Sequence, residues 1–175
     1  MEIRALREGD DRSQLRSGDP DLDRFFHKFA GQNQFKHYLG VTYVAVEGGR
    51  ILGFATVAPG HVEVDGLPVS VRKKLPRYPL PVLRLARLAV DQAARGQGLG
   101  RQLLRFVFQL ALRMASDYGC VGVVVDAKAD AVDFYRQYGF ISVELVEGQS
   151  DARPAPIPMF LATRAIRGAV GAKEA

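Results

Sequence analysis

The sequence predicts a mixed α/β (α+β) fold with one central mixed sheet. Strand-like segments alternate with segments of helical periodicity along the 175 residues. Near the middle of the chain, a glycine-rich turn joins a strand to the longest expected helix. Alternation of this kind is typical of a sheet covered by helices. We expect a single domain over residues 1–167 and a short C-terminal tail over 168–175.

The first third of the chain predicts a strand, a helix and a hairpin. Glu2–Leu6 is expected to open the fold as a short strand. Asp21–Lys36 carries apolar side chains at helical spacing and is expected to form an amphipathic helix. The strand-like segments Val41–Val46 and Ile51–Val57 are separated by Gly48-Gly49, which favours a tight hairpin turn.

The middle of the chain contains a second turn signal and a basic segment. Asp65-Gly66, flanked by His61–Val64 and Leu67–Val69, predicts a second hairpin. Val71–Val82 holds three prolines and four basic residues and is expected to be an exposed, extended loop. Leu83–Val90 follows as a strand.

The last third predicts one long helix and the closing strands. Leu99–Tyr118 has the periodicity of an amphipathic helix. Beyond it we expect a buried strand, a short helix and two closing strands, at Val121–Asp126, Ala129–Tyr138, Ile141–Val146 and Met159–Ile166. A proline-containing loop, Glu147–Pro158, joins the last two strands.

Composition limits the location and the partners. The formal net charge is +5 and the pI about 9.6, which fits either ordinary solubility or a polyanionic partner such as a nucleic acid or a phosphate-bearing cofactor. The single cysteine, Cys120, cannot form an internal disulfide and favours a reducing compartment. We see no signal peptide and no apolar run of membrane-spanning length, so we expect a cytoplasmic protein with no membrane partner.

The glycine-rich turn is the strongest local signal. Glycines let the backbone turn tightly and leave amide N–H groups open, and the following helix start offers further unpaired N–H groups and a positive dipole end. Such a turn can hold a pyrophosphate, although it can also be a plain strand-to-helix connection. No Gly-Lys-Ser/Thr follows, which excludes a P-loop, and the mid-chain position disfavours a dinucleotide-binding Rossmann site.

The segments RLAV…RGQGLGRQLL and DAVDFYRQYGF together resemble the GNAT superfamily of N-acetyltransferases. Its acyl-CoA signature, Arg/Gln-x-x-Gly-x-Gly/Ala, is matched by Arg95, Gly98 and Gly100. The resemblance implies acetyl-CoA as co-substrate and a sheet that splays between its fourth and fifth strands. It implies that the pantetheine arm binds the backbone of Leu88, Ala89 and Val90. For the pyrophosphate it implies Arg95, Gly96, Gln97, Gly98, Leu99, Gly100 and Arg101.

The same resemblance implies a catalytic acid. Tyr135 occupies the family position that faces the thioester sulfur, and a phenol with a pKa near 10 is protonated at neutral pH. A plain packing role is the alternative. No acidic residue or histidine lies in Leu83–Val90, and a base from His61, Glu63 or Asp65, or from water, stays open. An α-amine, with a pKa near 7.7–8.0, needs less help than a lysine amine.

Six basic residues precede or lie within the central strand. They could form the rim of a nucleic-acid site or a solvated surface. They are Arg72, Lys73, Lys74, Arg77, Arg84 and Arg87. The chain also resembles the acetyltransferase toxins of toxin–antitoxin pairs in three segments: SGDPDLDRFF, YVAVEGGRILGFATVAPGHVE and LPRYPLPVLRLARLAVD. It differs from them at two positions, where Ala86 replaces a frequent Gly and Phe54 replaces a frequent Tyr.

The toxin resemblance implies acetylation of the α-amine of aminoacyl-tRNA, which blocks translation. It also implies a ribbon-helix-helix antitoxin, and the family makes a homodimer plausible. Two other functions stay open: an N-acetyltransferase of a small-molecule or protein amine, and a non-catalytic acyl-CoA-binding module. No metal is expected.

Overall fold

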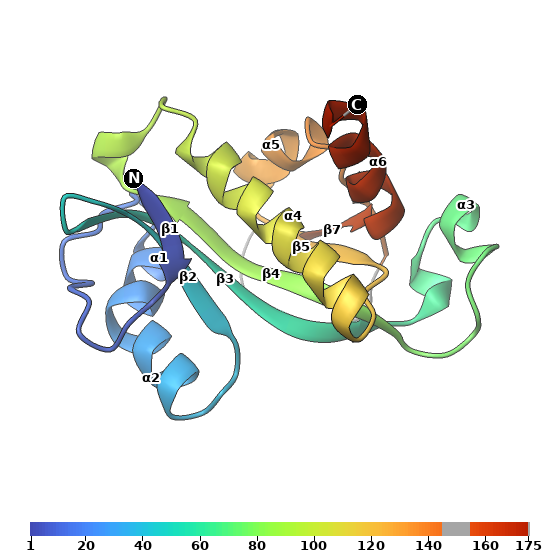
Figure 1. Ribbon diagram of the computed structural model, residues 1–175, viewed down its shortest axis with the longest axis horizontal. Coiled ribbons are helices and arrows are strands. Elements are labelled where there is room, and N and C mark those ends of the chain that lie inside the picture. Colours follow the sequence, from blue (N-terminus) through green and yellow to red (C-terminus); the bar gives the residue numbers. More distant parts are fainter. Residues whose placement is uncertain (145–154, 175) are drawn as a thin grey trace. The chain divides into compact units, whose positions relative to one another are not determined.

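The computed structural model describes residues 1–144 and 155–174, and over these residues a seven-stranded sheet has the order β1-β2-β3-β4-β5-β7-β6 (Figure 1). The neighbours β4 and β5 are parallel, so the sheet is mixed, as the sequence predicts. The chain divides into two compact units. The first comprises residues 1–58 and 85–109, and the second comprises 59–84 and 110–175.

The strands of the first unit form an antiparallel meander. β1 (Glu2–Ala5) pairs with β2 (Val41–Glu47), and β2 pairs with β3 (Arg50–Val62). The predicted hairpin at Gly48-Gly49 is confirmed, and β3 continues beyond its predicted end. The two glycines have φ angles of 58° and 77°, as a two-residue hairpin turn with a right-handed strand twist requires.

The predicted helix over Asp21–Lys36 is confirmed, with a π-helical turn in its middle. It consists of α1 (Pro20–Arg24), the π turn η1 (Phe25–Phe29) and α2 (Ala30–Phe35). The Asp19 carboxylate caps its start by accepting hydrogen bonds from the first amides of the helix.

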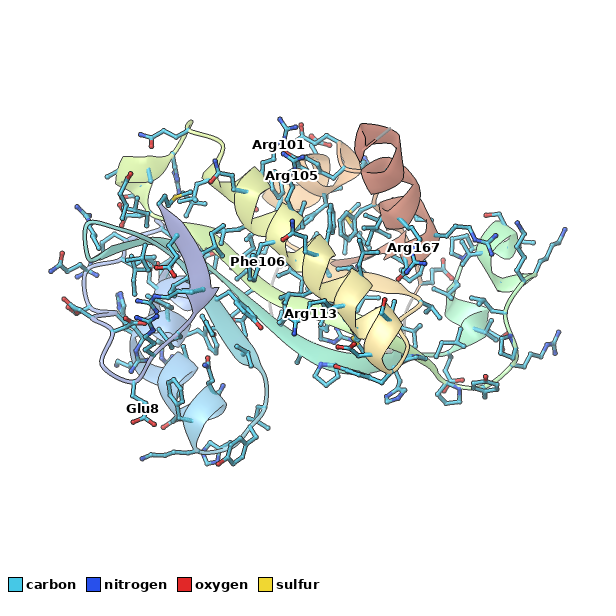
Figure 2. All side chains as sticks on the ribbon, viewed as in Figure 1. Glu8, Arg101, Arg105, Phe106, Arg113 and Arg167 are labelled. Carbon is cyan, nitrogen blue, oxygen red and sulfur yellow. The ribbon has the colours of Figure 1, made fainter. Side chains whose placement is uncertain are left out.

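Side-chain alternation in β2 and β3 places helices on both faces of this part of the sheet. On one face, Phe26 from η1 stacks on Phe54 with ring centroids 4.4 Å apart. On the other face, Tyr43 packs on Phe106 of α4 (Leu99–Asp117) at 4.9 Å. Figure 2 labels Phe106 on this helix. The first core cluster contains residues of β2, β3 and η1, so it includes the face of the sheet that the helix over residues 20–35 covers.

The central strand and the long helix lie close to their predicted bounds. β4 (Leu80–Val90) begins three residues before the predicted Leu83, and α4 ends one residue before the predicted Tyr118. Between them lies a short 3₁₀ turn, η3 (Gln92–Ala94). Across the described part of the chain, none of the helices combines the length and the apolar character needed to cross a membrane.

The second unit contains the remaining strands. β5 (Gly122–Ala127) pairs antiparallel with β7 (Ile157–Ala162), and β7 pairs with β6 (Ile141–Ser142). The predicted short helix after β5 is confirmed as a 3₁₀ turn, η4 (Ala129–Ala131), followed by α5 (Val132–Arg136). A second core cluster contains Val62, Val64, Leu67, Leu80, Val82, Val124 and Phe160.

The predicted second hairpin is wrong. Instead of two strands around Asp65-Gly66, the chain forms a 3₁₀ turn, η2 (Val64–Gly66), and a short helix, α3 (Val69–Arg72). Val64 and Leu67 are both buried at a spacing of three, which fits a helical turn and not a strand. Pro68, which caps α3, has no N–H to donate to a strand ladder. The basic segment is consequently helical at its start, and β4 occupies its last three residues.

The end of the chain also differs from the prediction. The strand expected over Met159–Ile166 stops at Ala162, and α6 (Thr163–Glu174) begins there. Thr163 ends the strand because its N–H donates to Val121 O at 2.9 Å and its hydroxyl to Cys120 O at 2.9 Å. Most of the expected tail is therefore helical. The last two residues of the strand expected to end at Val146, and most of the loop after it, lie outside the described residues.

Candidate functional site

The turn after β4 is held by a buried carboxylate. Asp91 is only 2% exposed, and its Oδ1 accepts a hydrogen bond from Arg16 N at 2.8 Å. Its Oδ2 accepts from Ala93 N at 3.0 Å and lies 3.5 Å from the Arg50 guanidinium. The N–H of Asp91 donates to Leu52 O at 2.7 Å. The start of the turn is thus fixed to two other segments of the first unit.

The next residues form an open cradle of main-chain amides. Gly96 and Gly98 have φ angles of 78° and 77°, and a Cβ at either position would meet no atom within 4 Å. The first hydrogen bond of α4 runs from Gln102 N to Gly98 O at 3.1 Å, so the amides of Leu99, Gly100 and Arg101 precede it. Open amides and the positive end of a 19-residue helix are the features that favour an anion at a helix start.

The arginines around the cradle point to different partners. The Arg95 guanidinium donates to Ser17 O, which lies in the N-terminal segment. Arg101 and Arg105 are exposed on the first turns of α4, where Figure 2 labels them. A cation in the first turn opposes the helix dipole. Arg101 is therefore electrostatically favourable only when an anion is bound nearby.

Part of β4 is more open than a central strand usually is. Ala86 is exposed and Leu88 is half-buried, whereas Leu85 and Ala89 are buried. Arg87 lies between them, with its guanidinium carbon 3.7 Å from the ring centroid of Phe25. Burial lowers the pKa of Arg87. Leu88–Val90, the segment implied for the pantetheine arm, thus comes directly after the most exposed part of the strand.

Tyr135 lies on α5 in the second unit, where an aromatic cluster and a helix end hold it. Its ring makes edge-to-face contacts with Phe134 at 5.2 Å and Phe140 at 5.4 Å. Phe140 N donates to Tyr135 O at 3.3 Å and Gly139 N to Arg136 O at 3.0 Å. With Gly139 at φ 96°, these bonds form a Schellman motif.

The Tyr135 side chain suits a proton donor. It is 5% exposed, and this burial raises its pKa above the ordinary 10.0. The packed ring thus carries a phenol that stays protonated at neutral pH.

The structure gathers three of the six predicted basic residues in one place. A hollow of about 450 Å³ in the second unit is lined by Val64, Asp65, Val69, Arg72, Lys73, Leu75 and Arg77. We call it the basic hollow. Lys74 is exposed next to it, and Arg84 forms an ion pair of 3.3 Å with Asp126 instead. Arg87, in the first unit, lies over Phe25.

Two functional candidates were missed from the sequence. Asp91 was part of the RLAVDQAARGQG segment, but only its position before a Gln-Ala-Ala turn indicated a capping role. Asp126, at the end of β5, gave no sequence signal for its pairing with Arg84, which is 42 residues away.

A strand, an open amide cradle and a long helix, set in a mixed sheet with parallel β4 and β5, are the arrangement expected of an acyltransferase. A family model described as "Acetyltransferase (GNAT) domain" matches residues 39–142, which include the cradle and Tyr135. The chain belongs to this acetyltransferase family.

Individual relatives agree with this family. A tRNA-acetylating toxin of Mycobacterium tuberculosis is 36% identical over 140 residues, which are 78% of this chain and 82% of that protein. The structure of AtaT complexed with acetyl-methionyl-tRNAfMet has a TM-score of 0.82 and 24% identity, covers 97% of this chain and 98% of that chain, and supports the fold. The crystal structure of AtaTR bound with acetyl-CoA has a TM-score of 0.77 at 25% identity, with 97% of each chain covered.

Proposed function

We propose that this protein transfers the acetyl group of acetyl-CoA to the α-amine of an aminoacyl-tRNA. The observation that carries the proposal is the 36% identity to a tRNA-acetylating toxin over most of both chains. The amide cradle, the half-open β4 and the basic hollow are features that this reaction needs. The acceptor amino acid and the tRNA are left to experiment.

The residues around the cradle fit the phosphate groups of acetyl-CoA. The amides from Gly96 to Arg101 bind the pyrophosphate, because the glycines leave them open and the helix start makes them positive. Arg101 adds a charge-assisted hydrogen bond. The backbone of Leu88, Ala89 and Val90 binds the pantetheine arm as an added strand, and an amide there stabilises the oxyanion of the reaction.

The chemical step needs one proton donor. The neutral amine nitrogen bonds to the thioester carbonyl carbon, and the carbon–sulfur bond breaks. Tyr135 gives its phenolic proton to the departing sulfur, and the proton lost by nitrogen returns to the phenolate through solvent. Tyr135 is suited to this role because burial keeps its phenol protonated throughout the neutral range.

The choice of an α-amine follows from the absence of a nearby strong base in the strand. β4 carries no carboxylate and no histidine along its eleven residues. Asp126 is occupied by Arg84 at 3.3 Å. An α-amine with a pKa near 7.7–8.0, lowered further by esterification of its carboxylate, has a sizeable neutral fraction near pH 7 to 8 without help, whereas a lysine amine does not.

The basic hollow fits a single-stranded RNA end. Arg72, Lys73 and Arg77 provide three cations, and Val64, Val69 and Leu75 provide an apolar wall. An unpaired nucleotide carries both a phosphate and a base that packs on apolar surface. The tRNA 3′ end has this chemistry, so the hollow is the proposed RNA contact.

The biological setting completes the proposal. A protein that modifies charged tRNA acts in the cytoplasm, where charged tRNA is used. We also propose that residues 1–167 act as one catalytic domain, that the protein forms a homodimer, and that a ribbon-helix-helix antitoxin neutralises it. A growth-arrest assay on expression with and without the neighbouring reading frame tests the antitoxin, and sedimentation tests the dimer.

The decisive experiment offers the purified protein a full set of charged tRNAs with acetyl-CoA. Mass spectrometry of the released aminoacyl-adenosines is expected to show a mass gain of one acetyl group on some of them. Uncharged tRNA, spermidine and a lysine peptide serve as competing acceptors. Turnover of a small amine with every charged tRNA unmodified would overturn the tRNA proposal and leave an acetyltransferase of another substrate.

A tyrosine pair tests the catalytic acid. Tyr135→Phe is expected to lower kcat by roughly 10²–10⁴-fold, the usual contribution of a positioned acid, with little change in the KM for acetyl-CoA. Tyr138→Phe, three residues along and half-buried, is the matched control and should retain activity. Equal activity of both variants would return Tyr135 to a packing role.

A further inference from the structure

The N-terminal segment Leu15–Gly18 forms hydrogen bonds to the phosphate-binding turn, although the two segments are about 75 residues apart in the sequence. We call this segment the latch. The main chain of Arg16 makes two of the bonds: its N–H donates to Asp91 Oδ1 at 2.8 Å, and its carbonyl accepts from Gln92 N at 2.8 Å. The backbone of one latch residue is thus held on both sides by the turn.

A third bond comes from the far end of the same turn. The Arg95 guanidinium donates to the carbonyl of Ser17. At Gly18 the chain has φ 91°, and a Cβ there would lie 2.6 Å from Gln92 Nε2 and 3.1 Å from Arg95 Nη2. The latch therefore contacts the turn at both ends of the segment from Asp91 to Arg95.

The latch is itself firmly held. Leu15 is 1% exposed and shares the first core cluster with Ala89 of β4. Ser17 is 4% exposed, and both its N–H, at 3.0 Å, and its hydroxyl, at 2.6 Å, donate to the Asp23 carboxylate of α1. Through the latch, the phosphate-binding turn is consequently attached to the first core cluster and to α1.

From these contacts we infer that the latch sets the conformation of the amide cradle, with Asp91 as the positioning residue that transmits it. Asp91 is 2% exposed, so its carboxylate is assigned a role through the turn and not through the coenzyme. Its carboxylate fixes Arg16 on one side and Ala93 on the other, so that Gly96 and Gly98 follow in their open conformation. Arg95, whose guanidinium is engaged by Ser17 O, is assigned to the latch and not to the pyrophosphate. The inference rests on the proposed binding of acetyl-CoA to the cradle.

The test compares Asp91→Asn with Asp10→Asn by calorimetry with CoA. The Asp91 carboxylate accepts from the N–H groups of Arg16 and Ala93, one on each oxygen. In Asp91→Asn one of these oxygens becomes an NH₂ group, which cannot accept a hydrogen bond, so the turn must rearrange. Asp10 is the matched control: its carboxylate pairs with Arg4 at 2.8 Å in the same unit and makes no bond to the turn. We expect the Kd for CoA to rise about tenfold in Asp91→Asn and to stay within twofold of wild type in Asp10→Asn.

Two further measurements separate positioning from loss of fold. Hydrogen exchange of the amides from Gln92 to Gly100 in the free protein should speed up in Asp91→Asn, while exchange in β2 stays as in wild type. Ser17→Ala, which removes the hydroxyl bonds to Asp23 and Asp19 but none of the bonds between the latch and the turn, should raise the Kd by roughly two- to threefold while the protein stays folded at the assay temperature. In both variants, kcat at saturating acetyl-CoA should remain near that of wild type.

The outcomes are distinct. A wild-type protein that binds no CoA would refute the proposed function. A wild type that binds CoA, together with Asp91→Asn and Ser17→Ala variants of unchanged Kd and unchanged exchange in the turn, would overturn the latch. A fall in kcat at saturation with an unchanged Kd would also overturn it, because positioning of the cradle acts on binding.

Discussion

The amide cradle and the basic hollow are both electropositive and both proposed to bind phosphates, yet they are built differently. The cradle presents main-chain N–H groups from a turn that buried hydrogen bonds hold in place, Asp91 above all. The hollow presents flexible side chains, and a hydrogen bond of 3.4 Å from the Arg72 side chain to Asp65 O joins two residues of its lining. A coenzyme has a fixed spacing of phosphates and suits fixed amides. An RNA end varies in conformation, and mobile side chains can follow it.

The largest effect on ligand binding should come from the cradle. In Gly98→Ala, a left-handed backbone costs about 1–2 kcal/mol, and the added methyl group stands in the open space beside the amides proposed to bind the anion. Together these should raise the Kd for CoA roughly 100-fold, as calorimetry would show, with tRNA binding unchanged.

Gly48→Ala is the control for that substitution. It imposes the same kind of strain at φ 58° with open space around it, but in the hairpin turn between β2 and β3. It should lower the unfolding midpoint and leave the Kd for CoA unchanged. If Gly48→Ala and Gly98→Ala weakened CoA binding equally, the cradle would lose its special role.

A pH profile separates both anion sites from the chemistry. Main-chain amides do not titrate, and Arg and Lys remain charged between about pH 6 and 9. The initial rate with charged tRNA at subsaturating concentration should therefore follow the neutral fraction of the α-amine. It should rise roughly 10- to 30-fold from about pH 6 to 8, and the lower figure applies when esterification lowers the pKa of the amine most. No decline is expected up to about pH 9, because burial raises the Tyr135 pKa and the phenol loses its proton only at higher pH. A falling limb inside that range would contradict this assignment.

The basic hollow should show a smaller, salt-dependent effect. Replacing Arg72, Lys73 and Arg77 by alanine should weaken binding of charged tRNA roughly tenfold at physiological salt. The slope of log K against log salt should become less negative by about 2, since each single-strand phosphate contact contributes about 0.7. Binding of CoA should not change. If the slope of log K against log salt for tRNA binding were the same in this triple variant as in wild type, the RNA would bind elsewhere.

The smallest effect concerns Arg84. Its ion pair with Asp126 is partly exposed, with 22% and 54% of the two side chains accessible, so it contributes little to stability. Asp126→Asn removes this ion pair and should strengthen tRNA binding by less than about threefold, with the unfolding midpoint nearly unchanged. Weaker tRNA binding in this variant would instead indicate that Asp126 itself takes part in acceptor binding.

Local signals predicted most of the fold. Gly48-Gly49 identified the hairpin because a two-residue turn demands positive φ angles at these positions. The strand, glycine turn and helix around Arg95 were located within a few residues because their periodicities change abruptly there. The errors arose where turn residues suit several structures. Asp65-Gly66 fits a hairpin or a 3₁₀ turn, and burial of Val64 and Leu67 decided between them.

The site was predictable only in part, for a related reason. Open amides and a phenol follow from local motifs, and both lie within the residues that the family model matches. The bond between Arg16 and Asp91 joins residues 75 positions apart through a backbone N–H, which carries no sequence signature. The partner of Arg95 is likewise a carbonyl that any residue at position 17 would offer. The exact pattern of side-chain contacts therefore required the folded chain.

The attachment of the glycine turn to Leu15–Gly18 has a practical consequence for protein engineering. A chimera that grafts the turn and the first half of α4 from a relative would bring new side chains against an unchanged N-terminal segment. Such a graft should keep coenzyme affinity only when the donor's counterpart of this segment is transplanted with it. The two pieces, distant in the gene, are best treated as one exchangeable module.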